Sequence, residues 1–108
     1  MSMNQEKKFG LTERDIQTIQ AIFKKYPEVV EVHIFGSRAK ENYKIGSDID
    51  LALINEGVSD KIIRKLQSDF EDSNLPYTVD LVNFPLLKHS DFIDHINRVG
   101  IIIYNSGE

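Results

Sequence analysis

The chain contains no cysteine, so it has no disulfide, no catalytic thiol and no thiolate metal site. This absence fits a reducing compartment, and we expect a cytoplasmic protein. No apolar run approaches the ~20 residues that a membrane-spanning helix requires, and the longest, 99–104, has the length of a strand. The polar, lysine-bearing residues 1–9 are not followed by an apolar stretch, so they do not resemble a secretory signal.

Clusters of lysine or arginine are also missing. The chain has 17 acidic against 13 basic residues, which gives a formal net charge of −4. A protein that binds long nucleic acid usually presents a basic face. The composition therefore argues against an extended nucleic-acid surface, and a small nucleotide or a protein partner fits it better.

Internal repeats, low-complexity segments and linkers rich in proline, glycine or serine are absent as well. The length of 108 residues fits a single domain, and 41% hydrophobic with 28% charged residues is typical of a globular one. We therefore predict one domain over residues 1–108, with flexible polar ends at 1–8 and 105–108.

The spacing of apolar residues predicts four strands and three main helices. Runs that are β-branched, aromatic or alternating in polarity predict strands at 29–35, 48–54, 77–83 and 101–104. Apolar stripes of helical period, with capping or breaking residues at their ends, predict helices from Thr12 to Pro27, from about Ser59 to Asp72, and from a Ser90 cap to Gly100. This order indicates an α/β (α+β) fold with a small mixed β-sheet and helices mainly on one face.

The first feature that can carry chemistry is a hydrophobic strand that runs directly into Gly36-Ser37. Glycine allows backbone angles that other residues avoid and lets a ligand come close, and Ser37 adds a hydroxyl. If a helix begins here, its free N–H groups form an anion site. Taken alone, such a turn is more often structural than functional.

The second feature is Asp48-Ile49-Asp50 at the start of a predicted strand. Alternation along a strand puts both carboxylates on one face, although aspartate is a poor strand former. Two unpaired like charges side by side raise one pKa or recruit a cation. With oxygen ligands only, the expected ion is Mg²⁺ or Mn²⁺. The alternative is a strand that begins in solvent, with both acids at its frayed end.

The third feature is Asp80, a lone acid inside the apolar run 77–83. Burying an uncompensated charge is costly, and no lysine or arginine lies nearby in the sequence. A metal ion shared with Asp48 and Asp50 would satisfy all three acids. The alternative is that Asp80 faces water on an open face of the sheet.

These features follow one another in a fixed pattern: Gly-Ser, ten intervening residues, Asp-x-Asp, and a third Asp on a later strand. The pattern resembles the signature of the DNA polymerase β-like nucleotidyltransferase superfamily. Over 35–52 and 75–82 the chain is similar to the minimal nucleotidyltransferase (MNT) family, whose members are paired with HEPN-domain proteins in toxin–antitoxin modules. Many relatives have a glycine where this chain has Glu41-Asn42, which implies a loop of different shape.

The resemblance implies a metal-dependent nucleotidyltransferase that transfers a nucleoside monophosphate to a hydroxyl of a macromolecular partner. The expected case is AMP from ATP and an HEPN-domain partner, in a hetero-oligomer of antitoxin and toxin. Asp48, Asp50 and Asp80 would be catalytic and would hold Mg²⁺ or Mn²⁺. The residues that would contact the nucleotide are Gly36, Ser37, Arg38 and Ser47.

Two other functions remain open. The chain would act as a non-catalytic binding module if it neutralised a partner protein by direct contact alone. Transfer to a small molecule is the other possibility, although 108 residues leave little material for an acceptor pocket. The three histidines show no metal-ligand spacing and are expected to be structural or exposed: His33, His89 and His95. Tyr43 is expected to be an exposed loop residue.

Overall fold

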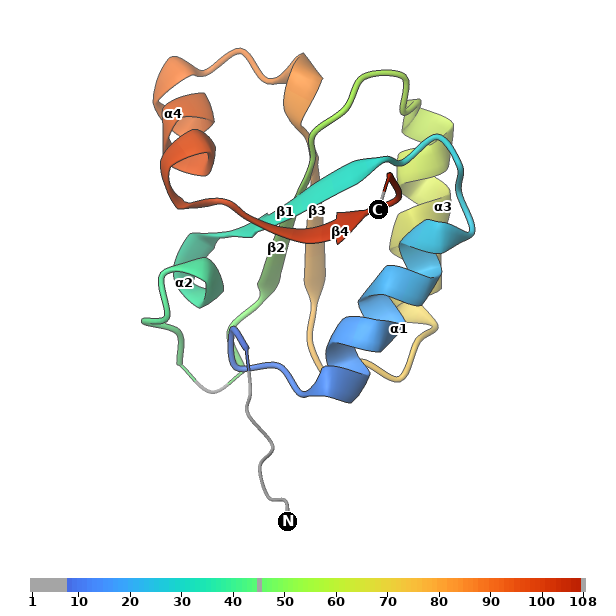
Figure 1. Cartoon of the computed structure of the whole chain (residues 1–108), viewed down its shortest axis with the longest axis vertical. Helices are drawn as coiled ribbons and strands as arrows, with labels where there is room; N and C mark the ends of the chain where they lie inside the picture. Colours follow the sequence, from blue (N-terminus) through green and yellow to red (C-terminus); the bar gives the residue numbers. More distant parts are fainter. Residues whose placement is uncertain (1–7, 45, 108) are drawn as a thin grey trace.

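A mixed sheet of four strands carries helices on both of its faces in the structure, a computed structural model that describes residues 8–44 and 46–107 (Figure 1). The elements follow one another in the order that the sequence predicts, with two short helices in addition. Their bounds are α1 (Glu13–Lys24), β1 (Glu31–Phe35), α2 (Gly36–Ala39), β2 (Ile49–Leu53), α3 (Asp60–Glu71), β3 (Val79–Asn83), the 3₁₀ helix η1 (Phe84–Leu86), α4 (Ser90–Val99) and β4 (Ile101–Asn105).

The strands lie in the order β3-β2-β1-β4. β1 runs antiparallel to both β2 and β4, whereas β2 and β3 are parallel. Parallel neighbours need a crossover connection, and α3 supplies it between β2 and β3. The predicted mixed sheet is therefore confirmed.

The start of α1 is set by local chemistry. The Thr12 hydroxyl accepts a hydrogen bond from the Asp15 backbone N–H, and the Asp15 carboxylate accepts one from the Thr12 N–H, each at 3.1 Å. This reciprocal capping box is the one that the sequence predicts. The helix ends at Lys24, before Pro27.

One face of the sheet packs against α1 and α3, and the other against α4 (Figure 1). The larger core lies on the first face, where Ile49, Leu51 and Leu53 of β2 are fully buried. Because side chains alternate along a strand, Asp50 and Ala52 must point to the opposite face. There Ala52 packs with Phe35 and Ile96 of α4 in a smaller cluster.

Several predicted boundaries are wrong by a few residues. β1 and β2 are shorter than the predicted 29–35 and 48–54, and Asp48 precedes β2. β3 begins at Val79 instead of residue 77. The cap of α4 is His89 and not Ser90, because the His89 ring accepts a hydrogen bond from the Phe92 N–H at 3.4 Å.

Within the described residues, no helix combines the length and apolar character that crossing a bilayer demands.

The predicted flexible ends fall mostly on residues 1–7 and 108, which lie outside the described residues. Lys8 and Asn105 are described, and both lie in β-structure. Lys8 forms a β-bridge with Leu11, and Asn105 is the last residue of β4. At these two positions backbone hydrogen bonds hold the chain, whereas the sequence predicts flexible ends.

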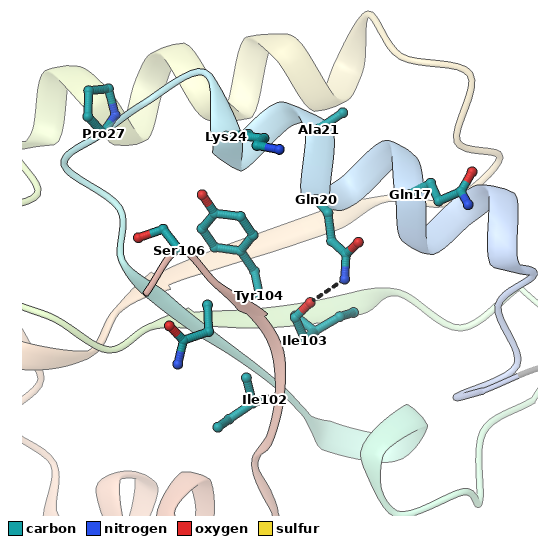
Figure 2. A pocket seen from close by; sticks show the side chains of 10 residues that line it. Gln17, Gln20, Ala21, Lys24, Pro27, Ile102, Ile103, Tyr104 and Ser106 are labelled. Atoms are coloured by element: carbon teal, nitrogen blue, oxygen red, sulfur yellow. Dashed lines mark hydrogen bonds between the residues drawn. The ribbon is translucent and has the colours of Figure 1, made fainter. Parts of the chain in front are cut away.

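An open groove runs between α1 and β4, which lies at one edge of the sheet (Figure 2). Gln17, Gln20 and Lys24 of α1 line one side, and residues 102–106 line the other. Across the groove, the Gln20 side-chain amide donates to the Ile103 carbonyl at 3.0 Å. None of the described residues that line the groove is acidic, so the groove is separate from the predicted site.

Phe23 joins the elements of the larger core. Its ring is fully buried and lies 5.4 Å from the Phe70 ring of α3 and 5.6 Å from the Tyr104 ring of β4, measured between centroids. Phe23→Ala should lower the free energy of unfolding by about 3–5 kcal/mol, because it leaves a cavity where α1, α3 and β4 meet. Urea unfolding measures this change. The exposed Lys61→Ala on α3 is the control and should change stability by less than about 0.5 kcal/mol, and an equal loss in both variants would contradict the assigned core.

Candidate active site

Gly36 stands where β1 ends and α2 begins. Its φ angle is +76°, in the region that side chains disfavour. A Cβ atom at this position would collide with the Asp50 carboxylate on the neighbouring strand. Both the backbone angle and the close approach to Asp50 therefore require glycine here.

The two strand aspartates lie side by side. Asp50 of β2 and Asp80 of β3 are register partners in the parallel pair, and Asp50 is also the partner of Phe35 on β1. Neighbouring strands are about 4.8 Å apart, so Asp80, Asp50 and the end of β1 form one continuous strip. The strip lies on the face that α4 shares and leads directly to the Gly36 turn.

Asp48 completes the acidic group from just outside the sheet. It is exposed and stands one residue before β2, two residues from Asp50. Asp80 is likewise exposed, whereas Asp50 is partly buried. The structure thus brings the three predicted acids to one end of one face of the sheet.

The electrostatics of Asp50 reflect this crowding. The pKa of Asp50 is raised from its ordinary value of 3.8 to about 6. Burial is the largest cause of this rise, and the carboxylates of Asp80 and then Asp48 contribute to it. The positive charge of Arg38 opposes it. Negative charge is therefore in excess around Asp50.

A divalent cation fits the chemistry of this group. Carboxylate oxygens are the ligands that Mg²⁺ and Mn²⁺ prefer, and a cation would relieve the repulsion that Asp50 experiences. As arranged, no three acidic or histidine side chains within the described part of the chain converge closely enough to form a complete metal site.

Arg38 does not face the site as a nucleotide ligand would. Its side chain is only 2% exposed, and its guanidinium donates to two backbone carbonyls, those of Ser47 and Phe9. A phosphate on the surface has little access to these N–H groups. The predicted contact between Arg38 and the nucleotide is therefore not one that this geometry offers.

Ser47 also has a local role in the structure. Its hydroxyl accepts a hydrogen bond from the Lys44 N–H at 2.9 Å, and its carbonyl accepts from Arg38. Both contacts shape the loop that leads to Asp48. The structure thus places Ser47 beside the acids as a loop-forming residue, and its predicted contact with a nucleotide stays a prediction.

The histidines have structural surroundings, as predicted. His33 and Glu31 form a 2.6 Å contact on β1, His89 caps α4, and the His95 ring packs edge-on against Phe35 with centroids 6.4 Å apart. Tyr43 is 37% exposed in its loop, also as predicted. Its ring nevertheless lies 5.3 Å from the Arg38 guanidinium carbon.

Two neighbours of the site were not found from the sequence. The Tyr77 ring lies 4.4 Å from the Arg38 guanidinium carbon, and the Phe9 carbonyl accepts from the same group. Phe9-Gly10-Leu11 is an apolar stretch with a glycine next to the polar residues 1–8. That contrast is the only local signal that the segment belongs to the folded part.

The chain is similar to known proteins in both sequence and structure. The family model described as Polymerase beta, Nucleotidyltransferase matches residues 17–108. The Haemophilus influenzae protein named "Probable protein adenylyltransferase MntA" is 33% identical over 90 residues, which cover 82% of this chain and 78% of that protein.

Two solved structures share the fold. A crystal structure of a toxin–antitoxin with AMP-PNP has a TM-score of 0.64 at 19% identity and covers 85% of this chain and 74% of its own. The crystal structure of the toxin–antitoxin MntA–HepT has a TM-score of 0.56 at 18% identity and covers 85% and 71%. At these identities the likeness shows the fold alone.

Asp50→Asn should stabilise the metal-free protein, and more at neutral pH than near pH 4. The folded pKa of about 6 lies above the ordinary value of 3.8, so the wild type loses stability as the pH rises between the two. Asparagine does not titrate and removes this loss. Thermal unfolding in the presence of a chelator, at both ends of that window, measures the difference. Equal differences at both pH values would contradict the assigned electrostatics, and added Mg²⁺ should raise the melting temperature of the wild type only.

Proposed function

This chain belongs to the polymerase beta nucleotidyltransferase family, and on that premise we propose that it transfers AMP from ATP to a hydroxyl group of a partner protein. The observation that carries the proposal is the pairing of Asp50 with Asp80 directly beside the Gly36 turn. The name of the Haemophilus influenzae relative supports a protein as the acceptor. The two toxin–antitoxin structures of the same fold support an HEPN-type toxin as that partner.

In the proposed reaction the acceptor hydroxyl oxygen forms a bond to the α-phosphorus of ATP, and the bond from that phosphorus to the pyrophosphate oxygen breaks. The hydroxyl proton passes to the Asp80 carboxylate. Asp80 suits this role because it is exposed and lies on β3, an edge strand that a large acceptor can approach. Pyrophosphate then leaves from the side of the Gly36 turn.

The phosphates of ATP would lie over Gly36 and Ser37. Gly36 has no side chain to fill the space beside Asp50, so the backbone of the turn is open to a ligand there. Ser37 follows it at the first turn of α2 and adds a hydroxyl donor. These two residues would orient the nucleotide so that its α-phosphorus faces the acids.

Asp48, Asp50 and Asp80 would together hold Mg²⁺ or Mn²⁺. A divalent ion bound there would neutralise negative charge on the phosphates and on the attacking oxygen. The contribution of the chain is to hold three carboxylates at one end of the sheet, on two paired strands and the residue before them. The local excess of negative charge is the physical support for this assignment.

Asp48→Asn should reduce AMP transfer by roughly 100-fold or more, because it removes a charged metal ligand from the proposed site. The measurement mixes the chain with an HEPN-domain protein as the acceptor, Mg²⁺ and ATP labelled at the α-phosphate, and follows label on that protein. Asp72→Asn is the matched control: it makes the same change at an exposed position that follows α3, outside the acidic group, and should keep wild-type transfer.

Undiminished labelling by Asp48→Asn would contradict the metal assignment. A separate measurement follows the toxicity of the partner in cells. If the double variant Asp48→Asn, Asp50→Asn still neutralises the partner as the wild type does, the chain acts as a binding module that works by direct contact.

A further inference from the structure

We propose that Arg38 is a positioning residue, whose buried guanidinium fixes the Gly36-Ser37 turn, the segment before Asp48 and the N-terminal turn 8–11 relative to one another. The inference rests on the proposed function, because what Arg38 positions is the proposed site. It also assigns a part in that site to a turn that the family match, which begins at residue 17, does not include.

The first link runs from the phosphate turn to the acids. Arg38 lies in α2, two residues after Gly36. Its Nε and Nη2 atoms both donate to the Ser47 carbonyl, at 3.1 and 2.7 Å. Ser47 directly precedes Asp48, so a fork of two hydrogen bonds sets the distance between α2 and the start of β2. Such a two-pronged contact is specific to the planar guanidinium.

The second link runs to the N-terminal turn. Arg38 Nη1 donates to the Phe9 carbonyl at 2.9 Å. The turn is closed by the hydrogen bond from the Leu11 N–H to the Lys8 carbonyl at 2.8 Å, and Leu11 is fully buried in the larger core. The Phe9 carbonyl is therefore a fixed acceptor, anchored to the core through Leu11 of the same turn.

The third link is aromatic. The guanidinium carbon lies 4.4 Å from the centroid of the Tyr77 ring and 5.3 Å from that of the Tyr43 ring. Tyr77 stands two residues before β3, which carries Asp80. Arg38 therefore lies in α2 and contacts the segments that precede β2 and β3, so it links the three elements that supply the proposed site. An attraction between the guanidinium and these ring faces helps to keep it in place, and no acidic residue of the described ranges 8–44 and 46–107 forms an ion pair with it.

Gly10 leaves room for this arrangement. A Cβ at Gly10 would come within 2.5–2.6 Å of the Tyr43 ring and 2.8 Å of Arg38 Nη1. Gly57 is a natural control. It also has a positive φ, +95° against +72° at Gly10, but a Cβ there would meet nothing within 4 Å. Alanine at either position strains the backbone, and only alanine at Gly10 also displaces Arg38.

The experiment compares Gly10→Ala, Gly57→Ala and Arg38→Lys in AMP transfer to the partner protein. Gly10→Ala and Arg38→Lys should lower kcat by on the order of 10- to 100-fold, as expected when catalytic groups move by a fraction of an ångström to 1 Å. The KM for ATP should change by less than about threefold, because no phosphate contact is lost. Gly57→Ala should keep wild-type kcat, and its thermal stability should fall through backbone strain alone, by less than that of Gly10→Ala.

A second readout does not depend on activity. The Ser47 N–H donates to the Lys44 carbonyl at 3.0 Å, and the Ile49 N–H donates to the Thr78 carbonyl at 2.9 Å. Hydrogen exchange at these two amides, measured on the nucleotide-free protein, should speed up in Gly10→Ala and Arg38→Lys and stay as in the wild type in Gly57→Ala. If the wild type transfers no AMP, the proposed function fails while this readout still tests the positioning role.

Two results would overturn the proposal. One is Arg38→Lys with near-normal kcat and a strongly raised KM for ATP, which is the behaviour of a phosphate ligand. The other is unchanged exchange at Ser47 and Ile49 in both Gly10→Ala and Arg38→Lys, which would show that the buried guanidinium does not set the geometry of the segment before Asp48.

Discussion

The parallel pairing of β2 with β3 puts Asp50 next to Asp80, and the rest of the site is arranged around that pair. Buried side chains on the opposite face of the sheet hold this pairing in place. Ile49, Leu51 and Leu53 fill the core against α1 and α3, so the residues between them must face the other way. A slip of β2 by one residue would turn Asp50 into the apolar core. The hydrophobic core thus fixes which face carries the acids.

Gathering three carboxylates at one end of the sheet costs free energy, and neighbouring residues reduce this cost. Asp50 is partly buried with two other carboxylates nearby, and the positive charge of Arg38 offsets part of the repulsion. Gly36 accepts a positive φ and gives up a side chain so that the turn can pass beside Asp50. α4 covers Phe35 and Ala52, whereas Asp48 and Asp80 stay exposed and Asp50 is partly buried. Strain and like charge gathered in one place are typical of a functional site.

The sequence was sufficient for the order of the main elements and for the face of β2 that carries Asp50, because both follow from local patterns. The alternation around Asp50 predicts its face, and the Thr12–Asp15 spacing predicts the cap of α1. The position of Asp80 beside Asp50 was inferred from the cost of burying a lone acid and from resemblance, and not from a pairing pattern, since strand register depends on the crossover through α3 and on core packing. Local patterns do not encode which strands pair.

The contacts of Arg38 could not be predicted from local patterns. An arginine after a Gly-Ser turn suggests a phosphate ligand, but its partner at Phe9 lies 29 residues away in the chain. No periodicity reports a contact of that range. The choice of His89 over Ser90 as the cap of α4 is a smaller case. Both residues can accept the hydrogen bond, and the path of the chain out of η1 decides between them.

The Gln20 side chain has a consequence for self-association. Strands at the edge of a sheet offer unpaired backbone groups to other chains. Here the amide of Gln20 occupies the Ile103 carbonyl at the middle of β4 (Figure 2). A further strand that extended the sheet past β4 would have to displace that amide, which stands directly after the exposed Ile101 and Ile102. A glutamine on a helix therefore hinders edge-to-edge growth at β4, whereas β3 forms the other edge of the sheet and stays open to a partner.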